Sequence, residues 1–218
     1  MEGAPPPFTR TTVTTTTIRT TTTPRPTRPT PVYTGQCQSS GDVTFILDSS
    51  GSVGEENFGR MRNFIASAVR DLEVDNGFFR IAVITYSDSA TVHFYLNTYS
   101  SKAEIFDAIH RIPYVYGYTN TADALRRARL DVYSPSHGDR TNVPNLVVMV
   151  TDGESNMNPQ QTLPEADRIR RSGTSIITVA VGVPNNLELS LNSRSRILQI
   201  SITLAAARAC IKPPRACI

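Results

Sequence analysis

The chain reads Val43-Thr44-Phe45-Ile46-Leu47-Asp48-Ser49-Ser50-Gly51-Ser52 where an apolar run gives way to polar residues. The apolar part predicts a buried strand, and the turn that follows carries one carboxylate, Asp48, and two hydroxyls, Ser50 and Ser52. Oxygen ligands with so little negative charge suit a hard divalent cation such as Mg²⁺. Because neutral hydroxyls do not cancel the charge of the cation, an anion supplied by another molecule would complete its coordination. The stretch therefore predicts a docking site built on a metal.

The middle of the chain alternates strand-like and helix-like patterns. Short runs rich in Val and Ile predict strands at residues 43–47, 80–86, 146–151 and 176–181, with an edge strand at 91–95. Continuous apolar runs are typical of strands buried on both faces of a parallel sheet. Apolar residues three or four apart predict helices at 58–72, 105–109 and 122–128, and a fourth is expected at 164–172. The expected fold class is α/β: a doubly wound, mostly parallel sheet flanked by helices.

Two more polar segments are expected beside the first turn, at the carboxyl ends of the strands. Thr151-Asp152-Gly153 follows a strand as Asp48 does, and the carboxyl ends of parallel strands meet at one rim. Between them, a loop that leads into a helix offers the hydroxyl of Thr119. The candidate metal ligands are therefore five oxygen-bearing side chains, Asp48, Ser50, Ser52, Thr119 and Asp152.

At these five residues the chain resembles the von Willebrand factor type A family with its metal-ion-dependent adhesion site. The family pattern is Asp-x-Ser-x-Ser, a Thr in a Thr-x-Thr loop and an Asp in a Thr-Asp-Gly turn, and the resemblance covers about residues 41–182. It implies that Ser50 and Ser52 coordinate the cation directly, with Thr119 joining them or acting through water. Asp48 and Asp152 would lie in or just behind the inner coordination shell and orient its waters.

The resemblance also implies a secreted, extracellular module in which Mg²⁺, or else Mn²⁺ or Ca²⁺, binds an acidic side chain of a matrix protein. That partner would be a collagen-like protein or another matrix glycoprotein. A structural matrix module of the same fold with a vestigial metal site is the alternative. The rim that contacts the partner is expected to consist of the residues flanking the ligands, Gly51, Tyr118, Asn120, Gly153 and Glu154.

Each candidate ligand also has a purely structural interpretation. Ser and Asp after a strand commonly cap the following helix, because their side chains accept from its free N–H groups. Thr119 could equally cap a helix starting at Thr121, and Asp152 with Gly153 could shape a turn. The five residues occurring together and in order favour the metal site.

A Mg²⁺-dependent hydrolase is a weaker alternative. A phosphatase that used Asp48 as nucleophile would need a second acid two residues later, where Ser50 stands, and usually a lysine to hold the phosphate. The middle of the chain has one lysine, Lys102. Ser50 as a nucleophile would need a histidine base and an orienting acid, and no histidine follows it at a strand-end loop. We therefore expect no enzyme.

Charge is distributed unevenly along the chain. Residues 42–188 carry 13 Lys and Arg against 18 Asp and Glu, whereas both ends are basic. An acidic middle argues against nucleic acid as the partner, since phosphate binding requires a basic face. No run approaches the roughly 18–20 apolar residues of a membrane-spanning helix.

The two ends differ from the middle in composition. Residues 1–36 are dominated by Thr and Pro and are expected to form an extended tether, of the composition found in O-glycosylated stalks. Residues 37–183 would be the type A domain, incomplete at its C-terminal end, and residues 184–218 a divergent basic tail. Alternation from Leu198 to Leu204 could supply a replacement edge strand. The tail is either a genuine ending or the product of an alternative or misjoined exon.

The three cysteines bracket the acidic middle. Cys37 would pair with Cys210 or Cys217 in an oxidising compartment, or all three thiols are unpaired. The start of the chain has neither the basic residues nor the apolar core of a signal peptide, so we expect either a fragment of a longer secreted protein or a lost export signal.

Overall fold

The computed structural model describes residues 40–153, 155–181 and 197–198. Within them six strands form one sheet in the order β3-β2-β1-β4-β5-β6. Neighbouring strands are parallel, except that β3 is antiparallel to β2. This confirms the expected doubly wound, mostly parallel α/β architecture. The strands are β1 (Gly41–Asp48), β2 (Phe79–Tyr86), β3 (Ala90–Phe94), β4 (Asn145–Thr151), β5 (Ser175–Ala180) and β6 (Ile197–Leu198).

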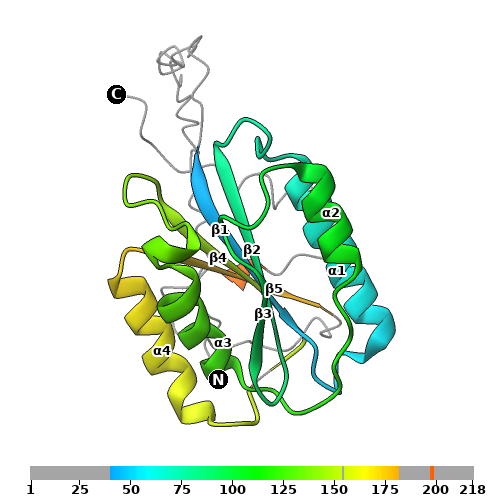
Figure 1. Ribbon diagram of the computed structural model, residues 1–218. Coiled ribbons are helices and arrows are strands. Elements are labelled where there is room, and N and C mark those ends of the chain that lie inside the picture. The colour runs from blue at the N-terminus through cyan, green and yellow to red at the C-terminus, as the bar shows by residue number, and fades with distance from the viewer. Residues whose placement is uncertain (1–39, 154, 182–196, 199–218) are drawn as a thin grey trace, which may run out of the picture. The chain divides into compact units, whose positions relative to one another are not determined.

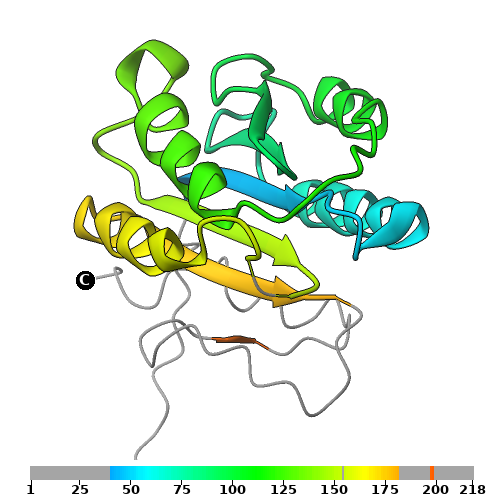
Figure 2. The same ribbon diagram turned by 90° about the horizontal axis from the view of Figure 1, so that it is seen from below.

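Helices cover both faces of the sheet (Figures 1 and 2). One face carries α1 (Gly54–Arg70) and α2 (Lys102–His110), and the other carries α3 (Thr121–Arg127) and α4 (Pro159–Arg171). A π-helical turn, Ala128–Val132, continues α3 directly, and a short 3₁₀ turn spans Pro135–His137. The central strands β1 and β4 are therefore enclosed between two helical layers, as their continuous apolar sequences predict.

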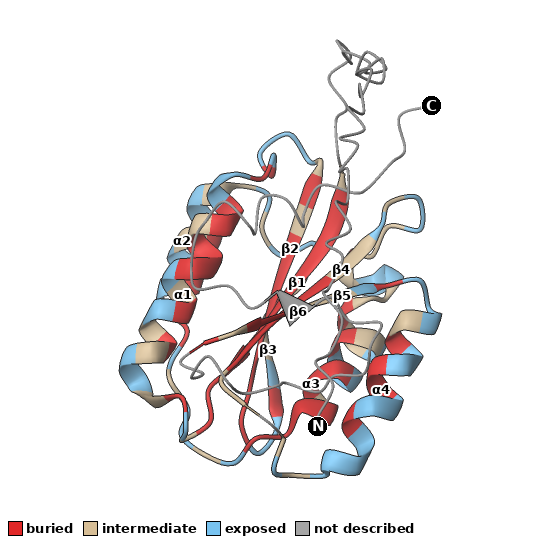
Figure 3. Cartoon of the chain, turned by 180° about the vertical axis from the view of Figure 1, so that it is seen from behind, coloured by how far each residue is buried: buried red, intermediate tan, exposed pale blue. Residues whose placement is uncertain are grey.

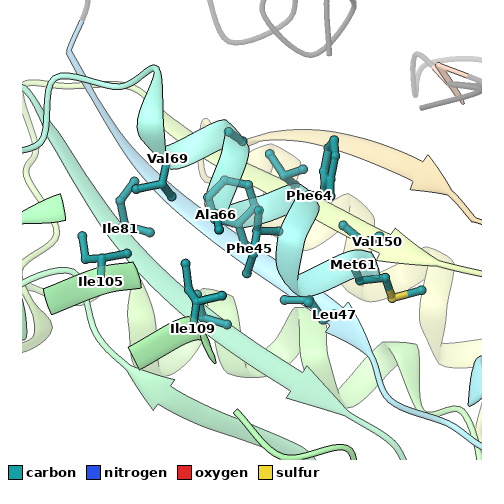
Figure 4. Packing of buried hydrophobic residues seen from close by; sticks show 14 of the residues in the cluster. Phe45, Leu47, Met61, Phe64, Ala66, Val69, Ile81, Ile105, Ile109 and Val150 are labelled. Carbon is teal, nitrogen blue, oxygen red and sulfur yellow. The ribbon is translucent and has the colours of Figure 1, made fainter. Parts of the chain in front are cut away.

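The side chains of β1 supply both halves of the core. Phe45 and Leu47 pack with residues of α1 and α2, whereas Ile46 packs with residues of α3 and α4. Figure 3 shows the strand buried along its length, and Figure 4 shows Phe45 and Leu47 beside Met61 and Phe64 of α1. Burying each such side chain contributes about 1.5–3 kcal/mol. The end of β1, where Asp48 stands, is thus fixed by packing on both faces.

The observed β1 is longer than predicted at its start because Asp42 is buried with a partner. Its carboxylate accepts hydrogen bonds from the backbone N–H and from Nε of Arg140, each at 2.8 Å. Arg140 also donates to the carbonyls of Gly41, Gly77 and Phe78. A buried carboxylate requires such pairing, so this acid extends the strand instead of ending it.

The predicted start of the fourth helix was wrong. α4 begins at Pro159 and contains Pro164 in its interior. Proline is well suited to the first helical position, where no N–H partner is available, and Pro159 occupies it. Burial of Thr162, Ala166 and Ile169 against the sheet keeps the helix continuous through Pro164.

Several expectations fall outside the described residues. These are the stalk at residues 1–36, Glu154, the cysteines Cys37, Cys210 and Cys217, and most of the tail from residue 184 onward. Of the alternating segment 198–204, the described part is Leu198, which belongs to β6 and pairs with Val179. Among the described helices, none combines the length and the apolar character needed to cross a lipid bilayer.

Candidate metal centre

The candidate site lies where β1 and β4 end side by side. These strands are parallel neighbours, and β1 connects onward to α1 on one face while β4 connects to α4 on the other. Open α/β sheets bind ligands at such a point, outside the carboxyl ends of the strands. Three connections meet there: residues 49–53 after β1, residues 111–120 before α3, and residues 152–158 after β4.

Asp48 forms the floor of the site. Its carboxylate is fully buried, and its Oδ1 accepts from the backbone N–H of Ser50 at 2.9 Å. Its Oδ2 accepts from the hydroxyl of Tyr86 at 3.1 Å and from the hydroxyl of Thr151 at 2.8 Å. Burial, and next the charge of Asp48, raise the pKa of Tyr86 well above its ordinary value. The phenol therefore stays protonated and remains a donor to the carboxylate.

The two serine hydroxyls contact each other, and that of Ser52 also contacts Asp152. Oγ of Ser50 is 3.2 Å from Oγ of Ser52, and the Ser52 hydroxyl donates to Oδ1 of Asp152 at 3.2 Å. Ser50 is buried, whereas Ser52 is exposed. The first and third connections therefore meet through oxygen atoms at a point that solvent can reach.

The capping interpretation of this turn was wrong. The N-cap residue of α1 is Val53, with helical backbone angles and no side-chain hydrogen bond to the helix. Asp48, Ser50 and Ser52 are therefore not used to start α1. The serine hydroxyls contact each other and Asp152 instead, and Asp48 accepts from the Ser50 N–H, Tyr86 and Thr151.

Asp152 is half-buried at the edge of the site. Burial, and next the charge of Asp48, raise the pKa of its carboxyl group. Thr151 shapes the turn beneath it, because its hydroxyl, which donates to Asp48, accepts from the N–H of Gly153 at 3.3 Å. No ion pair in the described part of the chain involves either Asp48 or Asp152. Two neighbouring carboxylates without a basic partner create a locally negative site.

Thr119 is buried, and the polar groups of its backbone are hydrogen-bonded to the connection after β4. Its N–H donates to Oδ1 of Asn156 at 2.8 Å, and its carbonyl accepts from the hydroxyl of Ser155 at 2.8 Å and from the N–H groups of Asn156 and Met157. Thr119 does not cap α3, because Asn120 does so by accepting from the N–H of Asp123. The structure thus joins the loop of Thr119 to the connection that carries Asp152.

The predicted rim residues have different surroundings. Tyr118 is 65% exposed, and Gly153 has open space around its Cα, whereas the side chain of Asn120 is engaged internally. Gly51 donates its N–H to the carbonyl of Gly117 at 2.9 Å, which ties the first turn to the Thr119 loop. Glu154 is outside the described residues.

Two tyrosines that sequence reasoning missed lie against the turn that carries Ser50 and Gly51. Tyr116 is 79% exposed and its ring covers Gly51, since a Cβ atom there would lie 2.7 Å from the ring. Tyr114 donates its hydroxyl to the carbonyl of Ser50 at 2.9 Å. The alternating pattern Tyr114-Val115-Tyr116-Gly117-Tyr118 directly before Thr119 was the available signal.

The donor set fits a hard cation. No three His, Cys, Asp or Glu side chains in the described ranges gather where they could hold a metal, so a cation here would depend on hydroxyl oxygens. Ser50, Ser52 and Asp152 offer oxygens that already contact one another, with Asp48 close behind them. Oxygen ligands are what Mg²⁺ and Ca²⁺ prefer, and one or two carboxylates with retained waters are typical of Mg²⁺.

Each of the three histidines has a hydrogen-bond partner other than Ser50. His93 contacts the hydroxyl of Thr85, His110 contacts the carbonyl of Phe106, and His137 contacts the carbonyl of Asp131. The hydroxyl of Ser50 contacts Ser52. A nucleophilic serine needs a base within hydrogen-bond reach. In the described residues, the side-chain partner of the Ser50 hydroxyl is the hydroxyl of Ser52.

The fold and this site define a type A domain. A family model described as the von Willebrand factor type A domain matches residues 42–197, and the chain belongs to that family. It is 34% identical to the collagen alpha-4(VI) chain of Mus musculus over 153 residues, which cover 69% of this chain and 6% of the relative. It is also 34% identical to von Willebrand factor of Rattus norvegicus over 149 residues, 68% of this chain and 32% of the relative.

A solved structure gives the same picture of the fold. Proximal thread matrix protein 1 from the mussel byssus, with a zinc-occupied MIDAS motif, is 32% identical with a TM-score of 0.58. The alignment covers 67% of this chain and 37% of that one. The chain therefore corresponds to part of each of these relatives, which are matrix and adhesion proteins.

Proposed function

We propose that this chain is a divalent-cation-dependent adhesion module that binds an acidic side chain of an extracellular matrix protein. The observation that carries the proposal is the contact chain from Ser50 through the exposed Ser52 to Asp152 at the carboxyl ends of β1 and β4. None of these oxygens starts α1, so they remain for a ligand. The relatives, which include a collagen chain and a thread matrix protein, support an extracellular location and a matrix partner.

The residues divide into ligands and supports. Ser50, Ser52 and Thr119 would offer neutral oxygens, and Asp48 and Asp152 would offer charged ones. When bound, Mg²⁺, Mn²⁺ or Ca²⁺ supplies a positive charge that attracts a carboxylate of the partner. Tyr86 and Thr151 keep the buried Asp48 oriented through hydrogen bonds. Such outer partners of metal ligands tune affinity as well as geometry.

Two exposed aromatic rings support a protein partner. Tyr116 and Tyr118 flank the candidate ligands on the connection before α3 and are 79% and 65% exposed. Tyrosine is enriched at protein interfaces because one side chain offers both apolar area and a hydroxyl. The partner segment would place an acidic residue at Ser52 and Asp152, with neighbouring side chains against the two rings.

The test is binding to immobilised collagens and matrix glycoproteins in Mg²⁺ and in EDTA. We expect binding in Mg²⁺ that EDTA abolishes, and loss of binding in Asp152→Ala and in the double variant Ser50→Ala with Ser52→Ala. Asp107→Ala and Ser100→Ala, two exposed substitutions outside the three connections, serve as matched controls. Equal binding in EDTA would instead support the structural matrix module with a vestigial metal site.

A further inference from the structure

We propose that Ser155 and Asn156 are positioning residues that set Thr119 for the cation. The inference depends on the proposed metal site and adds a determinant of its affinity. These residues belong to the connection between β4 and α4, which also carries Asp152. One connection would thus supply a ligand and also hold a second ligand that belongs to another loop.

The hydrogen bonds to Thr119 come from three consecutive residues. Oδ1 of Asn156 accepts from the Thr119 N–H at 2.8 Å. The Thr119 carbonyl accepts from the Asn156 N–H at 3.1 Å and from the Met157 N–H at 3.0 Å, and the Ser155 hydroxyl lies within hydrogen-bond distance of it at 2.8 Å and of the Met157 carbonyl at 2.9 Å. Both backbone polar groups of this loop residue are therefore satisfied by the neighbouring connection, as a buried loop position requires.

The neighbours of Thr119 are held from the opposite side. The Tyr118 N–H donates to Oδ1 of Asp88 at 2.6 Å, and the Asn120 N–H donates to the carbonyl of Ser87 at 2.9 Å. The backbone of residues 118–120 is thus hydrogen-bonded both to the turn after β2 and to the connection after β4. Loop residues are usually more mobile than strand residues. These backbone hydrogen bonds therefore fix the position of the Thr119 Cα, and with it the base of the side chain, before any ligand binds.

The consequence for binding is preorganisation. A ligand that is already ordered loses less conformational freedom when the cation binds, so affinity is higher. Outer residues that orient metal ligands change affinity by about 10-fold to 100-fold when they are removed. Because Asn156 is exposed, water can replace its side chain as the hydrogen-bond partner. We therefore expect its loss to weaken cation binding more than it weakens the fold.

The experiment compares Asn156→Ala, Asn156→Asp and Ser155→Ala with the wild type and with Gln160→Ala. Asn156→Asp keeps an acceptor oxygen, and Gln160 is an exposed residue in the first turn of α4. Mn²⁺ affinity is measured by calorimetry on the full chain. In EDTA, hydrogen exchange of the Thr119 amide and the melting temperature give readouts that need no metal.

We expect Asn156→Ala to lower Mn²⁺ affinity about 10-fold and to speed exchange at Thr119, with little change in the metal-free melting temperature. Asn156→Asp should bind Mn²⁺ at least as tightly as the wild type, Ser155→Ala should weaken binding, and Gln160→Ala should match the wild type. Wild-type affinity in both Asn156→Ala and Ser155→Ala would overturn the positioning role alone. A wild-type chain that takes up no Mn²⁺ would overturn the proposed function, and the positioning role with it.

Discussion

Asp48 is a buried carboxylate stabilised without an ion pair. Its three partners are a backbone N–H, a phenol and a threonine hydroxyl, supplied by the turn itself, by β2 and by β4. Hydrogen bonds to a charged group contribute about 1.5–3 kcal/mol each, more than those between neutral groups. The acid can therefore remain buried beside Asp152 while the neighbouring hydroxyls stay available.

Removing one of these donors should measurably destabilise the fold. Tyr86→Phe keeps the buried ring but removes the hydroxyl that donates to Asp48, so we expect a loss of about 1–3 kcal/mol in the free energy of unfolding. Urea unfolding in EDTA measures it. Tyr118→Phe, on a 65% exposed side chain, should change stability little. Equal midpoints for both variants would show that the Tyr86 hydroxyl does not support Asp48.

Sequence reasoning brought together the candidate ligands but not their supports. The five residues follow a local pattern, and the structure joins Ser50, Ser52 and Asp152 directly. Tyr86, Tyr116 and Asn156 each contact a candidate ligand or its turn across a gap of more than 30 positions, and only the assembled sheet and loops reveal those contacts. A tyrosine in a strand looks like an ordinary core residue until the register opposite Asp48 is known.

At the scale of elements, the continuous apolar strands were predictable and the start of helix α4 was not. Strands β1, β2, β4 and β5 are marked by runs of Val and Ile, because burial on both faces leaves few positions for polar residues. Either Pro159 or Pro164 could have marked the start of α4. Local sequence did not show which proline occupies the first helical position and which lies in the helix interior. In the folded chain Thr162, which lies between the two prolines, is buried as part of α4.

The interior proline gives a prediction for α4. Pro164 cannot donate the hydrogen bond of an ordinary interior residue, so Pro164→Ala should stabilise the protein by about 1–3 kcal/mol. Pro159→Ala, at the first helical position, should bring no such gain because no hydrogen bond is missing there. Thermal unfolding of both variants measures the difference. Equal effects would contradict the role assigned to position 164.

A second prediction concerns the ion pairs between α4 and the π-helical turn that follows α3. Burial alone would raise the pKa of Glu165, but hydrogen bonds and charges from Arg129 and Arg168 outweigh it, so the pKa is lowered. Oε2 of Glu165 is 2.9 Å from Nη2 of Arg129. A lowered pKa in the folded state adds stability that is present above the ordinary carboxyl pKa of 4.5 and is lost as the pH falls through the folded value.

Glu165→Gln should therefore flatten the decline in stability below about pH 4.5 and lower stability at pH 7. Denaturant unfolding at a series of pH values measures both effects. Glu56→Gln, which alters an exposed pair with Arg60 on α1, should leave the pH dependence close to that of the wild type. A wild-type pH profile in Glu165→Gln would refute the coupling.

At the scale of the whole molecule, a cation that binds only the folded chain must stabilise it. At a Mg²⁺ concentration about 100 times the dissociation constant, the gain is about 2.7 kcal/mol, which corresponds to several degrees in the melting temperature. We expect the increase in the wild type and in Asp107→Asn, reversal by EDTA, and no increase in Asp152→Asn. A melting temperature unaffected by millimolar Mg²⁺, Mn²⁺ and Ca²⁺ would count against the metal site.

Ser52 and Asp152 touch although 100 positions of the sequence separate them. They can come into contact only after β1 and β4 have paired. Pairing of strands that are distant in sequence is slow, because closing the long intervening loop costs entropy before the new contacts stabilise the chain. During synthesis the first turn leaves the ribosome well before its partner acid exists. The proposed cation site thus exists only once β1 and β4 have paired, so an unfinished chain that ends before Asp152 would lack it.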